Sequence, residues 1–403
     1  RSSHALLEDR SDLATGAHRL EDLFSALQGV DAVLYAHVGG RPADIARAED
    51  ARLRTAVEIH SDWGTFEWIV TDAFAQGYRV GIVANSDGHK GAPGACYPGA
   101  SEFGAYSGLT CFLAPALSRD DIFAAMRARH HYATTGARTH LEVTVDLGPG
   151  GAVYEIDPRV AQSTPRPAAR AMMGDIVHAP SGAVRLHVAA APHSPILRVD
   201  VLRGAEVVAT HLPWEHRPLG NRVRVAFQGA EYRGRGRQSY WQGEIRISGG
   251  EIRDLVRFNH WNLERPFAQQ DARRVAVDVV TTGNLVGCDM WLDGEIEITV
   301  ETGLARARAS VLSLTGLGHR TEAGGLDRNI TLTRLPERLT AEPLDWSTEL
   351  SCLPGRDTPI WVRVTYEDGH VAWSSPVYVI PEQCPSDPQT VRSGRSQELD
   401  GGA

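Results

Sequence analysis

The chain has 403 residues, which is long enough for two or more domains that each bury a hydrophobic core. Its 41 Lys and Arg residues and 50 Asp and Glu residues give a formal net charge of -9, which argues against a general nucleic-acid binder because such proteins usually carry a basic face. No apolar run approaches the roughly 20 residues that a transmembrane helix needs. The 5 cysteines are scattered without a C-x-x-C pair, which argues against a zinc ribbon or a dithiol redox site.

The first part of the chain alternates helical patterns with apolar runs. A short helical stripe at residues 20–27 is followed by an apolar run, residues 30–36, that ends at His37. Residues 42–54 are rich in Ala and Arg with charges spread along them, which predicts an exposed helix. At the other end of the chain, residues 386–403 lack apolar content and are predicted to form a disordered tail.

Residues 55–94 predict a strand–helix–strand unit. Two apolar runs, residues 56–59 and 80–84, are separated by apolar residues at the spacing of a helix that lies on a core. Gly77 follows this stripe as the expected end of the helix. The runs are continuously apolar, as parallel strands covered on both faces should be. In such units the chemically active residues collect beyond the carboxyl ends of the strands.

Residues that can bind a metal follow these runs. His37, His60 and Asp87 stand where three successive runs end, at intervals of 23 and 27 residues that suit βα units, and His89 comes two residues after Asp87. Imidazole and carboxylate groups that converge from rigid elements are the ligands that divalent transition metals prefer. A metal site is one interpretation of these residues, and polar loop residues in ordinary hydrogen bonds are the other.

Two further charged residues are candidates for the same site. Glu58 lies inside an apolar run, where a buried charge needs a partner, so it either orients a metal ligand or faces solvent. Arg138 follows Thr134-Thr135-Gly136 and could either bind an anion or belong to a structural turn. The chain lacks the P-loop, G-x-G-x-x-G, H-E-x-x-H and G-x-S-x-G motifs, which argues against the usual nucleotide-binding, zincin and serine-hydrolase sites.

From Leu141 onward the pattern changes to short segments of period-two alternation separated by turn signals, which indicates a β-sandwich. The predicted fold class is therefore α/β plus all-β. Three or four βα units cannot close a barrel of about eight strands, so residues 1–140 are predicted to form part of a barrel. Residues 141–385 are predicted to form a β-sandwich-like region that could divide into two subdomains near residue 265.

The segments VEIHSDWGTFE, VANSDGHKGAPG, GLTCFLA, HYATTGAR and DGHVAWSSPVYV together resemble the DUF3604 family of bacterial proteins. Members of this family are relatives of the PHP (polymerase and histidinol phosphatase) metal-dependent phosphoesterases. The resemblance runs from about His37 to Ile380. It implies a distorted PHP-type (β/α)7 barrel, present here as its C-terminal half, with divalent zinc, manganese or iron ions bound at the strand ends.

The resemblance also implies roles for individual residues. His37, Asp87 and His89 match metal ligands, whereas Glu58 and His60 match a segment that lines the site. The early His-x-His and further ligands of the family pattern would lie upstream of His37 and are not found, so we expect poor activity from this chain alone. With Glu58, His60 and Arg138 as the catalytic candidates, the predicted function is hydrolysis of a phosphoester by metal-activated water.

Two alternatives to this function remain open from the sequence. One is a non-catalytic binding protein that uses the β-sandwich, and the other is a metal-dependent enzyme of the amidohydrolase type. The expected partner is a small-molecule or phosphoester substrate, with no nucleic acid and no membrane span. Because the chain begins with Arg1 rather than Met, its N-terminus does not separate a cytoplasmic from an exported protein, and the oligomeric state is not predicted.

Overall fold

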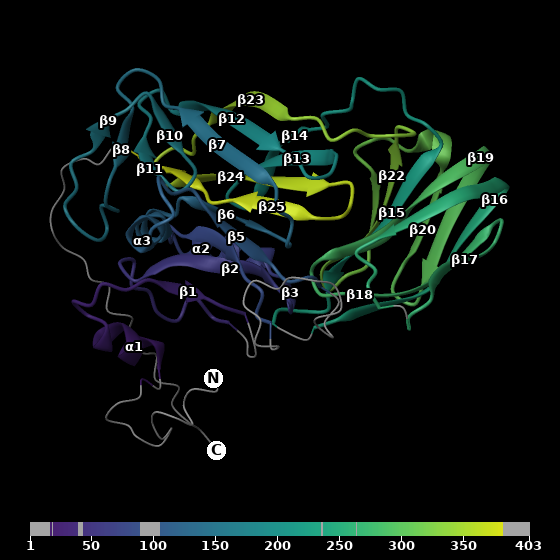
Figure 1. The fold of residues 1–403 in the computed structure, drawn as a ribbon, viewed down its shortest axis with the longest axis horizontal. Helices are drawn as coiled ribbons and strands as arrows, with labels where there is room; N and C mark the ends of the chain where they lie inside the picture. The colour runs from purple at the N-terminus through teal and green to yellow at the C-terminus, as the bar shows by residue number, and fades with distance from the viewer. Residues whose placement is uncertain are drawn as a thin grey trace, which may run out of the picture.

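The computed structural model describes residues 17, 19–38, 43–88, 105–234, 237–262 and 264–381. Across these residues the chain forms four β-sheets, with short helices packed at one end (Figure 1). The α-helices in this part of the chain are α1 (Leu20–Ala26), α2 (Glu67–Ala75) and α3 (Arg119–Ala128). None of these helices has the length and apolar character needed to cross a membrane.

The first sheet, here called the N-terminal sheet, contains the predicted strand–helix–strand unit. Its strands are β1 (Leu34–Ala36), β2 (Arg54–Ser61), β3 (Gly64–Thr65) and β4 (Gly81–Ala84). Strands β1 and β4 pair with β2 in parallel, and α2 crosses between β2 and β4. Ile69 and Val70 on α2 are fully buried against this sheet, so the predicted helix and both predicted strands are confirmed.

The first sandwich consists of a ten-stranded and a four-stranded sheet that enclose one apolar core. The strands of the larger sheet are β5 (Leu109–Phe112), β6 (His131–Thr134), β8 (Ala152–Tyr154), β9 (Arg166–Pro167), β11 (Ile176–His178), β13 (Ile196–Arg203), β14 (Glu206–His211), β24 (Thr358–Tyr366), β25 (Val371–Ser374) and β26 (Val377–Val379). The strands of the smaller sheet are β7 (His140–Asp146), β10 (Arg170–Met172), β12 (Ala183–Ala191) and β23 (Leu344–Ser351).

The second sandwich is inserted between β14 and β23 and is a separate eight-stranded sheet folded around its own core. Its strands are β15 (Arg222–Ala230), β16 (Ser239–Phe258), β17 (Phe267–Asp271), β18 (Arg274–Thr281), β19 (Leu285–Thr302), β20 (Arg306–Ser310), β21 (His319–Glu322) and β22 (Leu326–Leu335), with a 3-10 turn at η2 (Val311–Ser313). Register shifts within β16 mark bulges, which let this long strand bend.

The predicted fold class, α/β plus all-β with a partial (β/α)7 barrel, is wrong. Strands account for 50% of the described residues and helices for 9%, so in this part of the chain the N-terminal sheet is not surrounded by the helices of a (β/α)7 barrel. The helix predicted at residues 42–54 is replaced, over its described part, by turns. The Asp44 carboxylate accepts a hydrogen bond from the N–H of Ala46. The Asp50 carboxylate accepts hydrogen bonds from the N–H groups of Arg52 and Leu53. These side chains therefore bind backbone donors that a helix would use.

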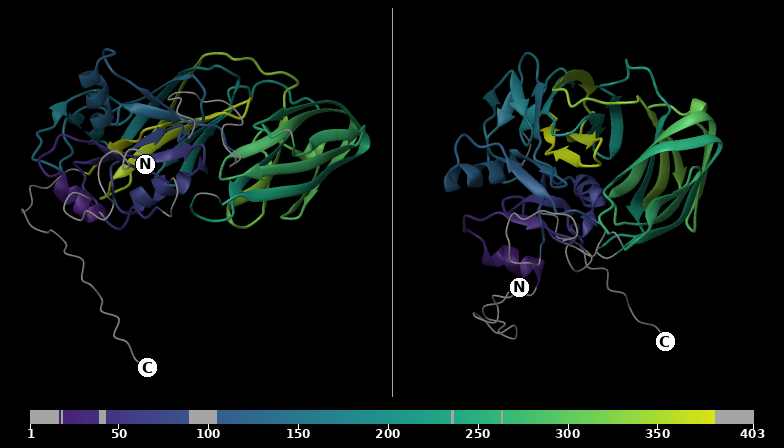
Figure 2. Two further views of the ribbon diagram at one scale, coloured as in Figure 1. Left: turned by 60° about the horizontal axis from the view of Figure 1, so that its bottom comes forward. Right: turned by 45° about the vertical axis from the view of Figure 1, so that its right-hand side comes forward.

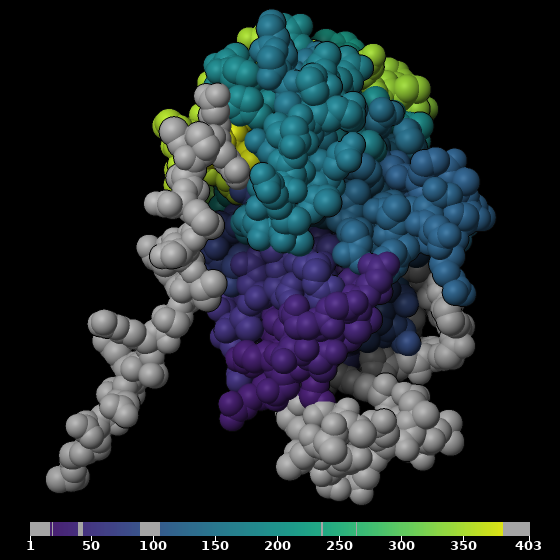
Figure 3. All heavy atoms as spheres, turned by 90° about the vertical axis from the view of Figure 1, so that its left-hand side faces the viewer, coloured from purple at the N-terminus to yellow at the C-terminus, as the bar shows by residue number. Residues whose placement is uncertain are grey.

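The sheets do not follow the order of the sequence. Strand β5 pairs with β6, and β6 pairs with β25 on its other side. The large sheet of the first sandwich therefore begins before residue 140. Both views in Figure 2 place the green second sandwich to one side of the other sheets. On the face drawn in Figure 3, the purple N-terminal residues lie directly against the blue-to-teal residues of the first sandwich.

A buried histidine lies where β4 meets β6. The ring of His131 is fully buried, and its Nδ1 lies 3.0 Å from the carbonyl oxygen of Ile82. Burial lowers the pKa of His131 from 6.5 to about 3, so the folded protein holds this imidazole neutral.

We predict that acid destabilises the protein through His131. Between pH 6.5 and about 3 the unfolded chain binds a proton that the folded chain does not, so the free energy of unfolding falls as the pH falls. The substitution His131→Gln should reduce this dependence by about 1.4 kcal/mol per pH unit below pH 6. Urea unfolding at several pH values measures it. The exposed His140→Gln should leave the dependence unchanged, and an equal slope for His131→Gln and the wild type would contradict the prediction.

Candidate functional site

The carboxyl ends of β1, β2 and β4 bring together four polar residues, here called the strand-end cluster: His37, Glu58, Asn85 and Asp87. Nδ1 of His37 lies 2.6 Å from Oε1 of Glu58. Its Nε2 lies 3.4 Å from Oδ2 of Asp87. The side-chain amide of Asn85 donates to the second oxygen of Glu58 at 2.8 Å. One imidazole therefore bridges two carboxylates, and the buried Glu58 has the partners that its position requires.

The electrostatics of the strand-end cluster favour a positive charge. The carboxylates of Asp87 and Glu58, in that order of effect, raise the pKa of His37 from 6.5 to about 10, although the Glu58 oxygen is the closer of the two. Asp87 adopts a left-handed backbone conformation with φ 45°, which non-glycine residues rarely adopt. This conformation turns the chain after β4 so that the Asp87 carboxylate faces the His37 ring.

The spacing on the Asp87 side of the ring is that of an ion pair and is also compatible with two ligands of one metal ion. A good N–H···O hydrogen bond measures roughly 2.7–3.2 Å, and the contact between His37 and Asp87 is longer at 3.4 Å. Two atoms that each lie about 2.05 Å from one tetrahedral ion are about 3.3 Å apart. On the opposite side of the ring, Glu58 occupies the position of the carboxylate that commonly orients a metal-binding histidine.

His60 lies outside the strand-end cluster, although it is two residues from Glu58. The register of β2 against β4 shifts between these two residues, which marks a bulge. Nδ1 of His60 lies 2.8 Å from the hydroxyl of Thr65, and Nε2 lies 2.7 Å from the carbonyl oxygen of Tyr106. Burial lowers the pKa of His60 to about 4. His60 is therefore a neutral side chain with both ring nitrogens engaged, and it fixes the position of Tyr106.

Two predicted site residues, His89 and Arg138, remain. His89 is outside the described residues. Arg138 is exposed to solvent in the segment between β6 and β7 and does not line the pocket between the sandwiches.

A second group of metal-ligand type lies at the turn between β24 and β25. We name His193, Asp368 and His370 the turn cluster; one ligand atom from each lies within 4.8 Å of the other two, and no other such group occurs in the described part of the chain. No sequence motif predicted this group. The Glu-Asp-Gly-His segment at residues 367–370 has the composition of a tight turn, and His193 precedes it by 175 residues in the sequence.

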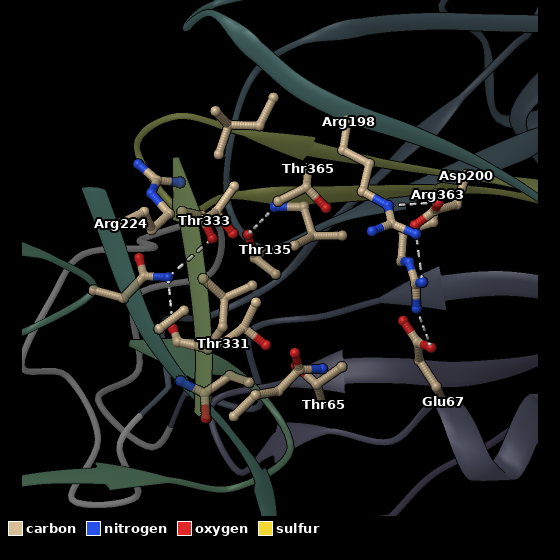
Figure 4. A pocket seen from close by; sticks show the side chains of 18 of the residues that line it. Thr65, Glu67, Thr135, Arg198, Asp200, Arg224, Thr331, Thr333, Arg363 and Thr365 are labelled. Atoms are coloured by element: carbon tan, nitrogen blue, oxygen red, sulfur yellow. Dashed lines mark hydrogen bonds and ion pairs between the residues drawn. The ribbon is translucent and has the colours of Figure 1, made fainter. Parts of the chain in front are cut away.

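A pocket of about 410 Å³ lies between the N-terminal sheet and the two sandwiches. Figure 4 shows threonine hydroxyls from several strands around it, with charged residues at either end. The charged residues neutralise one another: Arg363 binds Glu67 at 2.8 Å and Asp200 at 3.0 Å, and Arg198 binds Asp200 at 2.6 Å. The pocket therefore suits a neutral ligand that carries hydroxyl or amide groups.

A buried network of charges holds the second sandwich against the turn between β24 and β25. Asp289 accepts hydrogen bonds from Arg222 at 2.5 Å and from Arg224 at 2.7 Å, and all three side chains are buried. Arg222 also binds the Glu367 carboxylate at 2.6 Å, while Arg224 donates to the Glu367 carbonyl oxygen. Asp289 thus orients two arginines that reach from one sandwich to the other.

Comparison of the chain with family models, with curated proteins and with solved structures found no match. The resemblance drawn from the sequence motifs therefore stays a prediction.

We predict that Glu58→Gln lowers the pKa of His37 toward its ordinary value of 6.5. Glutamine keeps the size of the side chain but removes one of the two negative charges that stabilise the imidazolium. The pKa can be measured by following the imidazole resonances of the metal-free protein by NMR as the pH is varied. Glu142→Gln, at an exposed position on β7, should have no effect. An unchanged His37 pKa in Glu58→Gln would contradict the contact between the two side chains.

A separate prediction concerns the network between the sandwiches. Asp289→Asn removes the carboxylate that Arg222 and Arg224 share. Arg222 keeps its ion pair with Glu367, but Arg224 keeps only the Glu367 carbonyl oxygen, so the loss of its buried carboxylate partner should lower the free energy of unfolding by about 3 kcal/mol. Equilibrium unfolding in urea measures this change. The matched control is Asp293→Asn on the same strand, whose exposed ion pair with Arg253 should contribute less than about 1 kcal/mol. Equal effects of the two substitutions would disprove the role of Asp289.

Proposed function

We propose that the protein is a metal-dependent hydrolase whose reaction centre is the strand-end cluster, with phosphoesters as the substrate class. The observation that carries the proposal is the bridge of His37 between Glu58 and Asp87 at the carboxyl ends of three neighbouring parallel strands. Chemistry in open sheets of this kind collects at that edge. The choice of phosphoesters rests on the motifs of the sequence.

The donor set fits a divalent ion of the zinc, manganese or iron type. Nε2 of His37 and Oδ2 of Asp87 would be the ligands, at the separation of 3.4 Å described above. A bound divalent ion would supply Lewis acidity and would lower the pKa of a water molecule that attacks phosphorus.

The other residues of the cluster prepare His37 for this role. With Nδ1–H of His37 directed at Glu58, Nε2 would be the nitrogen that binds an ion, and the ion would have to displace the Nε2 proton that the two carboxylates stabilise. Asn85 donates to the second Glu58 oxygen and so helps to hold the Glu58 carboxylate against His37. His60 takes no part in proton transfer in this proposal because both of its nitrogens are already engaged.

A second candidate function is supported by the pocket between the sandwiches. Its threonine hydroxyls and mutually neutralised charges favour binding of a neutral, hydroxyl-rich molecule without catalysis. His60 lines this pocket, whereas His37, Glu58 and Asp87 do not. The two candidate functions therefore use different surfaces and are separated by an assay for catalysis.

We predict metal-dependent hydrolysis of p-nitrophenyl phosphate or bis(p-nitrophenyl) phosphate when manganese or zinc is added to the chelator-treated protein. His37→Ala and Asp87→Ala each remove a ligand and should lower kcat/KM at least about 100-fold. Release of p-nitrophenolate is followed by absorbance.

The matched control for these variants is His140→Ala, which removes an exposed imidazole from β7 and should keep full activity. Activity that is equal in His37→Ala and the wild type would defeat the hydrolase proposal. No metal-dependent turnover of either ester by the wild type would also defeat it and would leave the binding function as the better account.

A further inference from the structure

We propose that His193, Asp368 and His370 form a second site, which binds a divalent transition-metal ion of the zinc class. The proposal starts from geometry: one ligand atom from each of the three residues lies within 4.8 Å of the others, and Nε2 of His193 is hydrogen-bonded to Oδ2 of Asp368 at 2.7 Å, so an ion would replace the proton between these two atoms. Two imidazoles and one carboxylate form a donor set that zinc and related ions bind with three protein ligands and one open position.

The ring of His370 is held by a hydrogen bond that leaves Nε2 for a ligand. Its Nδ1 lies 2.9 Å from the hydroxyl of Thr135, which also accepts the backbone N–H of Val371 at 3.0 Å. A hydroxyl oxygen has two lone pairs, so it can accept from both groups. In the tautomer whose Nδ1–H donates to Thr135, Nε2 carries no proton and can bind a metal. A neighbouring acceptor commonly orients metal-binding histidines in this way.

The carboxylate and the second imidazole are also held in place. Oδ1 of Asp368 accepts the backbone N–H of His370 at 3.1 Å, which directs Oδ2 toward His193. The backbone N–H of Glu367 donates to the carbonyl oxygen of Pro195 at 2.8 Å, so the turn is tied to the loop that carries His193. The three ligands therefore come from two segments with a direct connection, and binding an ion requires little ordering of the chain.

The second sandwich stiffens the same turn from the other side. Asn259 donates to the carbonyl oxygen of Gly369 at 2.9 Å, and Arg222 binds the side chain of Glu367. Arg222 therefore neutralises Glu367, which leaves Asp368 as the carboxylate available to an ion.

Two of the three residues of the turn cluster border a cavity. Asp368 and His370 line a space of about 570 Å³ between the two sandwiches, and Tyr106 lies on the same wall. An ion with three protein ligands can bind water or a ligand atom at its remaining position, and the cavity would supply a route to an ion held here. The site shares no residue with the strand-end cluster, so the proposal does not depend on the proposed hydrolase function.

The test uses the whole chain, free of added histidine tags, in the background His37→Ala/Asp87→Ala so that the strand-end cluster cannot contribute. Cobalt(II) is titrated into the chelator-treated protein, and visible absorption reports coordination by nitrogen and oxygen ligands. We expect one equivalent of cobalt to bind and zinc to displace it. Adding His193→Ala or Asp368→Asn should weaken binding at least about 100-fold, and Thr135→Val should weaken it about 10-fold.

The control in this background is His140→Ala, which should bind cobalt as the background does because its ring is exposed on β7. Asp368→Asn keeps the shape of the side chain and a hydrogen-bond acceptor, so it separates loss of a ligand from loss of the fold. Absence of cobalt binding by the background protein would overturn the proposal. Undiminished affinity in both His193→Ala and Asp368→Asn would overturn it as well.

Discussion

The hairpin of β24 and β25 is the element that connects the N-terminal sheet, the first sandwich and the second sandwich. Glu67, at the start of α2, accepts hydrogen bonds from Arg363 on β24 and from the indole of Trp373 on β25, each at 2.8 Å. Trp361 and Trp373 are buried in the core that the hairpin shares with α2, and truncating a buried indole costs roughly 3–5 kcal/mol. At its tip the hairpin is held by the second sandwich. Its position therefore sets where all three units meet.

This arrangement places the two candidate metal clusters in one connected network. His60 binds the carbonyl oxygen of Tyr106, and the ring of Tyr106 lies 5.8 Å from that of His370 in the turn cluster. The N–H of Gly108 donates to the carbonyl oxygen of Asn85 in the strand-end cluster at 3.0 Å. The segment at residues 105–108 thus contacts both clusters. Because His60 is neutral and fully engaged, it serves this segment as a rigid support and not as an acid or base.

The sequence predicted local structure well where apolar spacing alone decides it. The stripe between β2 and β4 is helical, and Gly77 adopts the left-handed conformation expected of a residue that ends a helix. The prediction failed at residues 42–54 because composition does not reveal that Asp44 and Asp50 capture neighbouring backbone N–H groups. The pairing of β6 with β25 was not predicted, since a pairing across more than 230 residues leaves no periodic pattern in either segment.

The two clusters show the same contrast at the level of chemistry. The strand-end cluster could be predicted because the parallel strands of βα units repeat at intervals of roughly 20–30 residues and end at one edge of the sheet. Residues that follow successive strands in the sequence therefore lie close together in space. The turn cluster follows no such rule. Asp368 and Gly369 are residues that any tight turn favours, and only the pairing of β13 with β24 brings the preceding loop and His193 beside them. The residue types at this turn indicate only a turn when they are considered one by one. A ligand set assembled by antiparallel pairing of distant strands is therefore recognised only once the register of the sheet is known.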